Sequence, residues 1–157
     1  MTEENILGTG VEHEKIQYMV VRLGDEQYGI DIKYIDNIVR MQSITRVPKI
    51  QNYFKGVINL RGEVIPVMSL RIKMGLEDDE YTNISRIIII KLESDAAIGI
   101  LVDEVKEVVT LDETCIDKVA YDAMDERSNY ITGVGKNNGG LISLLDMHVI
   151  IGEKETS

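Results

Sequence analysis

The feature that most constrains the fold of this chain is an internal repeat. Residues 53–75 align without a gap to residues 130–152, and six of the 23 aligned positions are identical. Seven further positions exchange one apolar residue for another, and Ser69 aligns with Asp146, which exchanges one helix N-cap residue for another. The identical pairs are Tyr53/Tyr130, Gly56/Gly133, Val57/Val134, Gly62/Gly139, Ile65/Ile142 and Gly75/Gly152. The offset from residue 53 to residue 130 is longer than the roughly 20–50 residues of a solenoid repeat. It therefore predicts one small unit that is present twice.

A second and fainter similarity lies upstream, at a shorter spacing. Residues 29–32 align with residues 99–102, and three apolar residues after the first segment align with three valines after the second. These aligned pairs are Ile35/Val105, Ile38/Val108 and Val39/Val109. Both parts of each copy therefore recur in the same order, although glycine and apolar periodicity can also produce such similarity by chance in a β protein.

Each copy consists mainly of short apolar runs bounded by turn residues, a pattern that is typical of β-strands. We expect strands over residues 17–23, 27–31, 37–41 with 44–47, 57–60 and 64–68, and then over 86–92, 98–102, 105–111, 131–135 and 141–145. Short helical turns are expected after Asp31, over 69–74 and over 146–151. About five strands per copy predict a mainly β fold of two small five-stranded barrels, with short connecting helices and a groove between the barrels.

The charged run over residues 77–80 is the clearest boundary in the chain. We expect an N-terminal tail over residues 1–14, a single domain over 15–152 and a C-terminal tail over 153–157. Within the domain, lobe one is expected over about 15–76, a linker over 77–82 and lobe two over about 83–152.

The turns that join the repeated strands differ between the copies. Copy two has asparagines before Gly139, the usual chemistry of a hairpin turn, because both residue types tolerate positive φ. Copy one instead has Leu60 and Arg61 before Gly62, and neither is needed to make a turn. Either Arg61 is a solvated loop charge and Leu60 folds back onto the core, or the pair forms a contact surface of apolar area and a five-donor guanidinium.

Composition and charge exclude several classes of protein. The net charge of −10 is uneven, with +1 over residues 1–76 and −11 over 77–157, so we expect no nucleic-acid partner. The longest aliphatic run, 87–90, lies between charged residues, and the N-terminus lacks the apolar stretch of a signal peptide, so we expect no membrane insertion. Because Cys115 is the only cysteine and cannot form an internal disulfide, we expect a cytoplasmic protein.

Motifs of enzyme active sites are missing from the sequence. We find no phosphate-binding loop, no dinucleotide-binding glycine pattern and no serine nucleophile motif. His13 and His148 lie too far apart in sequence to suggest a metal site, and the acidic run 77–80 lacks the ligand spacing of a calcium loop. We therefore expect no catalytic residue, no metal and no cofactor, and instead an interaction module.

Three segments of the first copy closely resemble the CheW-like family of bacterial chemotaxis coupling proteins. They read G-D-E-Q-Y-G-I-D-I over residues 24–32, K-G-V-I-N-L-R-G over 55–62 and V-I-P-V over 64–67. Residues 99–103 and 130–133 also fit, so the resemblance covers roughly 15–152. It implies two five-stranded, SH3-like barrels, which agrees with the internal repeat. It also implies a non-catalytic adaptor that couples chemoreceptors (methyl-accepting chemotaxis proteins) to the histidine kinase CheA, with no small-molecule substrate.

The resemblance further implies that the tip of the receptor's cytoplasmic helical hairpin lies in the groove between the barrels. The matching positions, which we expect to bind the receptor, are Ile35, Asn37, Ile38, Gly56, Leu60, Arg61, Gly99 and Val108. Arg61 falls on the family's signature arginine, which favours a contact role. Asn37 stands where many members carry glutamate, so an ion pair with a receptor base is not expected there. The protein would act at receptor arrays beneath the inner membrane.

The regulatory domain of the kinase, itself CheW-like, is expected to dock on the barrel edges. One candidate surface is the interrupted strand over residues 37–47, which carries Arg40 and Gln42. The other is the loop over 116–125, where Tyr121 and Met124 lie in a polar, acidic stretch, as apolar anchors with a polar rim do at interfaces. In the alternative interpretation, Tyr121 covers the end of its own barrel.

Three other functions are compatible with these patterns. The first is a CheW-like coupling module of a twitching-motility or other kinase array. The second is a small-ligand-binding barrel, which predicts an enclosed apolar cavity with convergent polar groups. The third is an enzyme that uses the acidic residues 77–80.

Overall fold

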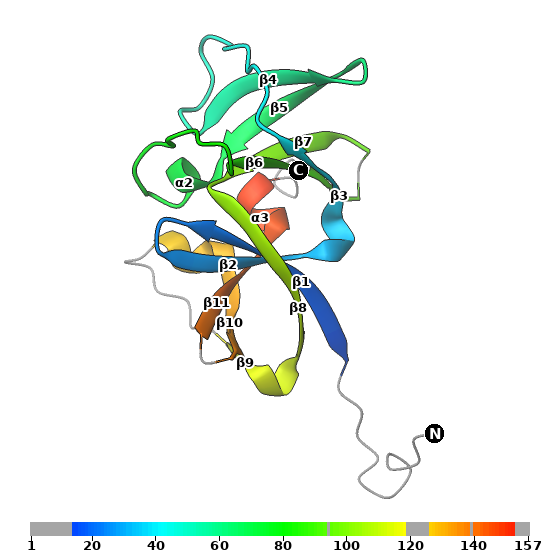
Figure 1. Ribbon diagram of the computed structural model, residues 1–157, viewed down its shortest axis with the longest axis vertical. Helices are drawn as coiled ribbons and strands as arrows, with labels where there is room; N and C mark the ends of the chain where they lie inside the picture. Colours follow the sequence, from blue (N-terminus) through cyan, green and yellow to red (C-terminus); the bar gives the residue numbers. More distant parts are fainter. Residues whose placement is uncertain (1–13, 94, 119–125, 139, 153–157) are drawn as a thin grey trace, which may run out of the picture.

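The computed structural model describes residues 14–93, 95–118, 126–138 and 140–152, and it contains two β-sheets that lie one above the other in Figure 1. The six-stranded sheet has the order β8-β1-β2-β11-β10-β9, with β1 (Lys15–Leu23), β2 (Glu26–Asp31), β8 (Glu104–Asp112), β9 (Ile116–Lys118), β10 (Ile131–Asn137) and β11 (Gly140–Leu145). The five-stranded sheet has the order β3-β6-β7-β5-β4, with β3 (Ile35–Arg40), β4 (Phe54–Leu60), β5 (Glu63–Ser69), β6 (Arg86–Lys91) and β7 (Ala97–Val102). The helices are α2 (Leu70–Lys73) and α3 (Met147–Ile151), and the 3-10 turns are η1 (Ile32–Tyr34), η2 (Glu113–Cys115) and η3 (Glu126–Tyr130). We call the two halves the six-stranded lobe and the five-stranded lobe.

The two sheets exchange strands. β1 and β2 pair with β8 and β11, whereas β6 and β7 pair with β3 and β5. The chain therefore crosses from one lobe to the other after β2 and crosses back after β7. As a result, the sheets do not follow the division that we expected, with lobe one over 15–76 and lobe two over 83–152. The sequence repeat is compatible with either arrangement, because it fixes the order of strands in each copy and not the sheet that each strand joins.

The second half of each copy folds alike. β4, β5 and α2 correspond to β10, β11 and α3 at the spacing of the sequence repeat. The Ser69 amide donates to the Tyr53 carbonyl at 2.7 Å, and the Asp146 amide donates to the Tyr130 carbonyl at 2.8 Å. The Ser69 and Asp146 side chains then cap α2 and α3 by accepting hydrogen bonds from backbone amides of the first turn. The domain is thus built from two intertwined copies of one unit.

An apolar core is shared between the lobes, and each lobe has a smaller apolar cluster of its own. On β1, Val21 and Leu23 lie in the shared core, whereas Tyr18 and Val20 lie in the cluster of the six-stranded lobe. Met19 also packs against the shared core and Ile16 against the other cluster, so successive residues of β1 alternate between the two, as the side chains of a strand do. The isoleucines 87–90 of β6 alternate between the shared core and the cluster of the five-stranded lobe. Strand exchange therefore places two strands with both faces buried at the centre of the molecule.

The six-stranded sheet has one strand more than the five that we expected. The additional strand, β9, pairs with β10, and its central pair is Asp117 with Val134. The five-stranded lobe has a single isolated bridge at the corresponding place, between Thr45 and Val57. Because Val57 and Val134 are repeat partners, β9 and the segment around Thr45 cover matching edges of the two sheets.

Candidate functional site

The hairpin of β4 and β5 ends in a two-residue turn formed by Arg61 and Gly62. Both have positive φ, 55° for Arg61 and 84° for Gly62, as a type I′ turn requires. The Asn59 Oδ1 accepts a hydrogen bond from the Gly62 amide at 3.2 Å. The counterpart of Arg61 in the other hairpin is Asn138, which has a φ of 52°. Because asparagine adopts this backbone readily and arginine does not, the first copy holds an arginine here at a cost of roughly 1–2 kcal/mol.

Leu60 and Arg61 lie in different surroundings at this hairpin tip. Leu60 is half-buried and packs against the apolar cluster of the five-stranded lobe, which confirms that it folds back onto the core. Arg61 is exposed, and in the part of the chain that the structure describes its guanidinium has no hydrogen-bond or ion-pair partner. Its five donors are therefore available to another molecule.

Three of the other expected receptor-binding residues lie on β3. Ile35 and Ile38 are half-buried and pack against the shared core. Asn37 is also half-buried, and its Oδ1 accepts a hydrogen bond from the Ile38 amide at 2.8 Å. Val108 on β8 is 45% exposed and pairs with Met19, which packs against the same core. The structure therefore brings Ile35 and Ile38 to the rim of the shared core, whereas the Arg61 tip adjoins a different apolar cluster.

The two glycines among the expected receptor-binding residues are needed by the fold. Gly56 has a φ of 139°, and a Cβ added there would overlap the backbone carbonyl of Thr45. Gly99 is buried on β7, and an added Cβ would lie 2.7 Å from a methyl group of Ile87. At both positions the absence of a side chain allows neighbouring atoms to pack closely. A substitution there would therefore disturb the packing of the lobe as well as any binding surface.

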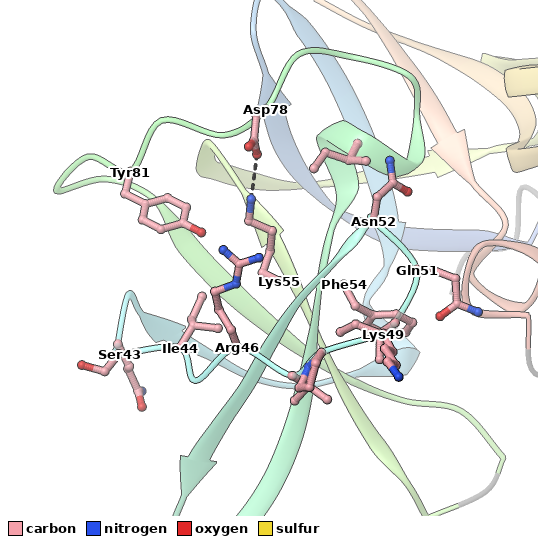
Figure 2. Close-up of a pocket in the computed structure, with 15 residues that line it drawn as sticks. Ser43, Ile44, Arg46, Lys49, Gln51, Asn52, Phe54, Lys55, Asp78 and Tyr81 are labelled. Carbon is pink, nitrogen blue, oxygen red and sulfur yellow. Dashed lines mark hydrogen bonds and ion pairs between the residues drawn. The ribbon is translucent and has the colours of Figure 1, made fainter.

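A hollow of about 830 Å³ lies beside β4 and the loop that follows β3 (Figure 2). Arg46 and Lys49 line it, and both are exposed without a hydrogen-bond or ion-pair partner among the described residues. Lys55 also lines it and pairs with Asp78 at 2.7 Å. Burial opposes the charge of Lys55, but the hydrogen bond to Asp78 and nearby acidic groups hold its pKa above its ordinary value. The other lining residues are Gln42, Ser43, Ile44, Val47, Pro48, Ile50, Gln51, Asn52, Phe54, Ile72 and Tyr81.

Of the expected kinase-binding residues that the structure describes, one lines this hollow and one does not. Gln42 lines it, and Arg40 is exposed at the end of β3. Tyr121 and Met124 lie outside the described residues. The sequence interpretation missed Arg46 and Lys49, although their position on either side of Pro48 and close to Lys55 was a signal for a basic loop.

A group of charged side chains joins the lobes at the place where β7 leads into β8. The Arg71 guanidinium on α2 donates two hydrogen bonds to Asp103, at 2.8 and 2.7 Å, and the Gly24 amide donates to the same carboxylate at 2.8 Å. Arg22 on β1 pairs with Glu104 at 2.7 Å. Burial alone would raise the pKa of Asp103, but the bonds from Arg71 and Gly24 hold it below its usual value. This group therefore links the turn after β1, helix α2 and the crossing into β8.

The acidic segment after α2 packs against its own lobe. The Ser69 hydroxyl donates to Asp79 Oδ2 at 2.6 Å, and Asp79 Oδ1 is buried without a partner among the described residues. Burial raises the pKa of Asp79 above its usual value. Asp78 is held by Lys55, so two of the four acidic residues have structural partners. Within the described ranges, no group of three or more His, Cys, Asp or Glu side chains could hold a metal ion, and no helix has the length and apolar character needed to cross a membrane.

Two lobes with apolar clusters inside them, an exposed arginine without a partner among the described residues, and a hollow lined by basic side chains are typical of a protein-interaction module. A family model described as a CheW-like domain matches residues 17–155. The chain is 35% identical over 138 residues to the chemotaxis protein CheW of Helicobacter pylori, covering 88% of this chain and 82% of the relative. It is 33% identical over 139 residues to the chemotaxis protein CheW of Bacillus subtilis, covering 88% of each.

Among solved structures, the scaffolding protein TtCheW from Thermoanaerobacter tengcongensis is similar, with a TM-score of 0.79 and 30% identity over 87% of this chain and 92% of that chain. The chain therefore belongs to the CheW-like family. The expected mainly β fold of two SH3-like lobes is confirmed.

Proposed function

We propose that this protein is a non-catalytic adaptor that couples chemoreceptors to the histidine kinase CheA at receptor arrays. Its membership of the CheW-like family over most of its length supports this function, because the relatives that it matches are chemotaxis proteins and a scaffolding protein. The observation that carries the proposal is the hairpin tip. Arg61 occupies a turn position that favours asparagine, and the corresponding hairpin of the second copy has asparagine at this position. Arg61 is unfavourable for the turn and has no partner among the residues that the structure describes, which supports a contact with another molecule.

For the receptor, we propose binding through the Arg61 tip and the exposed parts of β3 and β8. Ile35 and Ile38 present half-buried apolar side chains, and Val108 is more exposed. An apolar helix face can pack on such side chains, while Arg61 can reach polar or acidic groups beside it. Gly56 and Gly99 contribute by shape, since neither has a side chain that could contact a partner.

For the kinase, we propose two docking surfaces on matching edges of the lobes. The segment around Thr45, with Arg40 and Gln42, covers one edge, and β9 covers the other. β9 leads directly into the segment that contains Tyr121 and Met124. A partner with two CheW-like lobes of its own could therefore meet either edge with the same kind of surface. Neither docking step requires chemistry, because the adaptor changes the population of active kinase by binding.

Co-sedimentation with receptor-containing membranes tests the receptor surface. We expect Arg61→Glu and Val108→Asp to lose at least tenfold in association while remaining folded. The matched control is Asn138→Glu, which places the same charge at the corresponding turn of the other hairpin and should bind as the wild type does. If Arg61→Glu and Asn138→Glu bind equally well, the proposed receptor surface is wrong.

A pull-down on immobilised CheA, in the absence of receptor, tests the kinase surfaces. We expect Arg40→Glu and Tyr121→Ala to weaken kinase association and to leave receptor association unchanged. The reverse pattern, with receptor association lost and kinase association kept, would contradict the assignment of these two residues.

A further inference from the structure

Two side chains at matched positions of the repeat hold the two places where the chain crosses between the lobes. Arg71 on α2 aligns with His148 on α3. Arg71 holds Asp103, where β7 leads into β8. The His148 ring packs edge-on against Tyr34, with ring centroids 5.3 Å apart, where β2 leads into β3. His148 Nε2 also lies 2.7 Å from Glu93 Oε1, in the connection between β6 and β7. Each helix therefore uses the same position to hold one crossing.

The two contacts differ in how their charge responds to pH. An arginine side chain stays protonated in proteins, so the Arg71 contact keeps its charge at every physiological pH. Histidine is the side chain that ordinarily changes charge between about pH 5 and 8. The hydrogen bond with His148 lowers the pKa of Glu93 below its usual value, so Glu93 is a carboxylate throughout this range. Only the contact at His148 can thus gain a full ion pair as the pH falls.

Glu93 interacts more strongly with a protonated His148 ring than with a neutral one. The His148 side chain is 28% exposed, its Nε2 lies 2.7 Å from Glu93 Oε1, and an imidazolium there would attract this carboxylate. Lys33 opposes this, since its Nζ lies 5.1 Å from the Tyr34 ring centroid, although it is partly neutralised by Asp31 at 3.9 Å. The other charged groups on elements packed against α3 are Asp146, which caps the helix, and Arg127 on η3.

We propose that His148 is a pH-sensitive positioning residue for β3, the strand that carries Ile35, Asn37 and Ile38. Protonation strengthens its pairing with Glu93 and thereby fixes the ring that packs against Tyr34 of η1, from which β3 continues without an intervening residue. The consequence for binding rests on the proposed function, because it requires that the receptor contacts β3. Since a half-exposed ion pair contributes only a modest free energy, we expect receptor association to rise about two- to fivefold between pH 8 and pH 6.

Amide chemical shifts of the free protein test the positioning role without any receptor. In the wild type, the amides of residues 35–38 should shift with the same midpoint as the His148 ring. In His148→Arg they should stay near their low-pH positions, and in His148→Gln near their high-pH positions. His13→Gln, which removes the only other histidine, should titrate as the wild type does. If the amides of β3 do not follow the His148 titration, or still follow pH in His148→Gln, the proposal is overturned.

Receptor association at pH 8 and pH 6 tests the consequence. The rise expected for the wild type and for His13→Gln should be absent in both His148 variants, with His148→Arg bound at the higher level and His148→Gln at the lower. An equal pH dependence in His148→Gln would overturn the proposal, because any titration in the receptor affects all variants alike. If no variant binds receptor at either pH while the amides of β3 still titrate with His148, the proposed receptor function fails and the internal link stands.

Discussion

Replacement of Arg61 by asparagine should stabilise the protein and weaken its receptor association. Arg61 adopts a φ of 55°, a left-handed conformation that costs an ordinary L-residue roughly 1–2 kcal/mol, whereas asparagine tolerates it. Asparagine still has part of this cost, because it visits the left-handed region less freely than glycine does. We therefore expect Arg61→Asn to raise the free energy of unfolding by about 0.5–1 kcal/mol, a rise in Tm of about 1–4 °C.

Urea unfolding at pH 7, followed by circular dichroism, measures the stability difference, and co-sedimentation with receptor membranes measures the loss of binding. The reciprocal control is Asn138→Arg, which places arginine at the matched turn, where φ is 52°. That variant should lose about the same free energy of unfolding and keep receptor association. If Arg61→Asn is less stable than the wild type, or Asn138→Arg is equally stable, the reasoning from the turn geometry is refuted.

Three further substitutions test the structural interpretation by urea unfolding. Gly56→Ala should lower the free energy of unfolding by at least about 2 kcal/mol, because its methyl group overlaps the Thr45 carbonyl at an unfavourable φ; a neutral effect would contradict this geometry. Asp103→Asn should cost about 1–3 kcal/mol at pH 7 through the loss of its charged bonds with Arg71. Because the folded pKa of Asp103 is lowered, this cost should disappear as the pH falls through that pKa, and a cost that persists in acid would count against the ion pair. For Asp79, burial raises the folded pKa, so the wild type loses stability as the pH rises through that pKa. The free energy of unfolding of Asp79→Asn should therefore increase relative to that of the wild type between pH 4 and 7. A difference in free energy that does not change with pH would refute this assignment.

Local patterns in the sequence predicted most of the secondary structure. The repeat of residues 53–75 in 130–152 identified two hairpins and the helices that follow them, because glycines and cap residues at fixed spacing are typical of turns and helix ends. The cap at Asp31 and the short turn after it were also predicted, and the Asp31 side chain accepts a hydrogen bond from the Lys33 amide at 3.0 Å. These features depend on contacts between residues close together in the chain.

The exchange of strands between the lobes could not be predicted in the same way. β1 and β6 are apolar on both faces, which indicates burial but does not say which strands cover them. The contact between Arg71 and Asp103 depends on that arrangement, and so does the contact between His148 and Tyr34. Among the site residues, the sequence could identify Arg61 as unusual, since an arginine is rare at such a turn position. The sequence could not show that Leu60 packs against the apolar cluster of its lobe. Nor could it show that Arg46 and Lys49 line a hollow.

The most direct test of the adaptor function is the phosphorylation rate of CheA in a mixture with receptor-containing membranes, measured with and without this protein. We predict that the wild type brings the kinase under receptor control and that Arg61→Glu, shown to be folded, does not, while Asn138→Glu behaves as the wild type. If the kinase rate with receptor is the same with and without the wild-type protein, coupling is not its function. The fold would then belong to the family without the activity proposed for this chain.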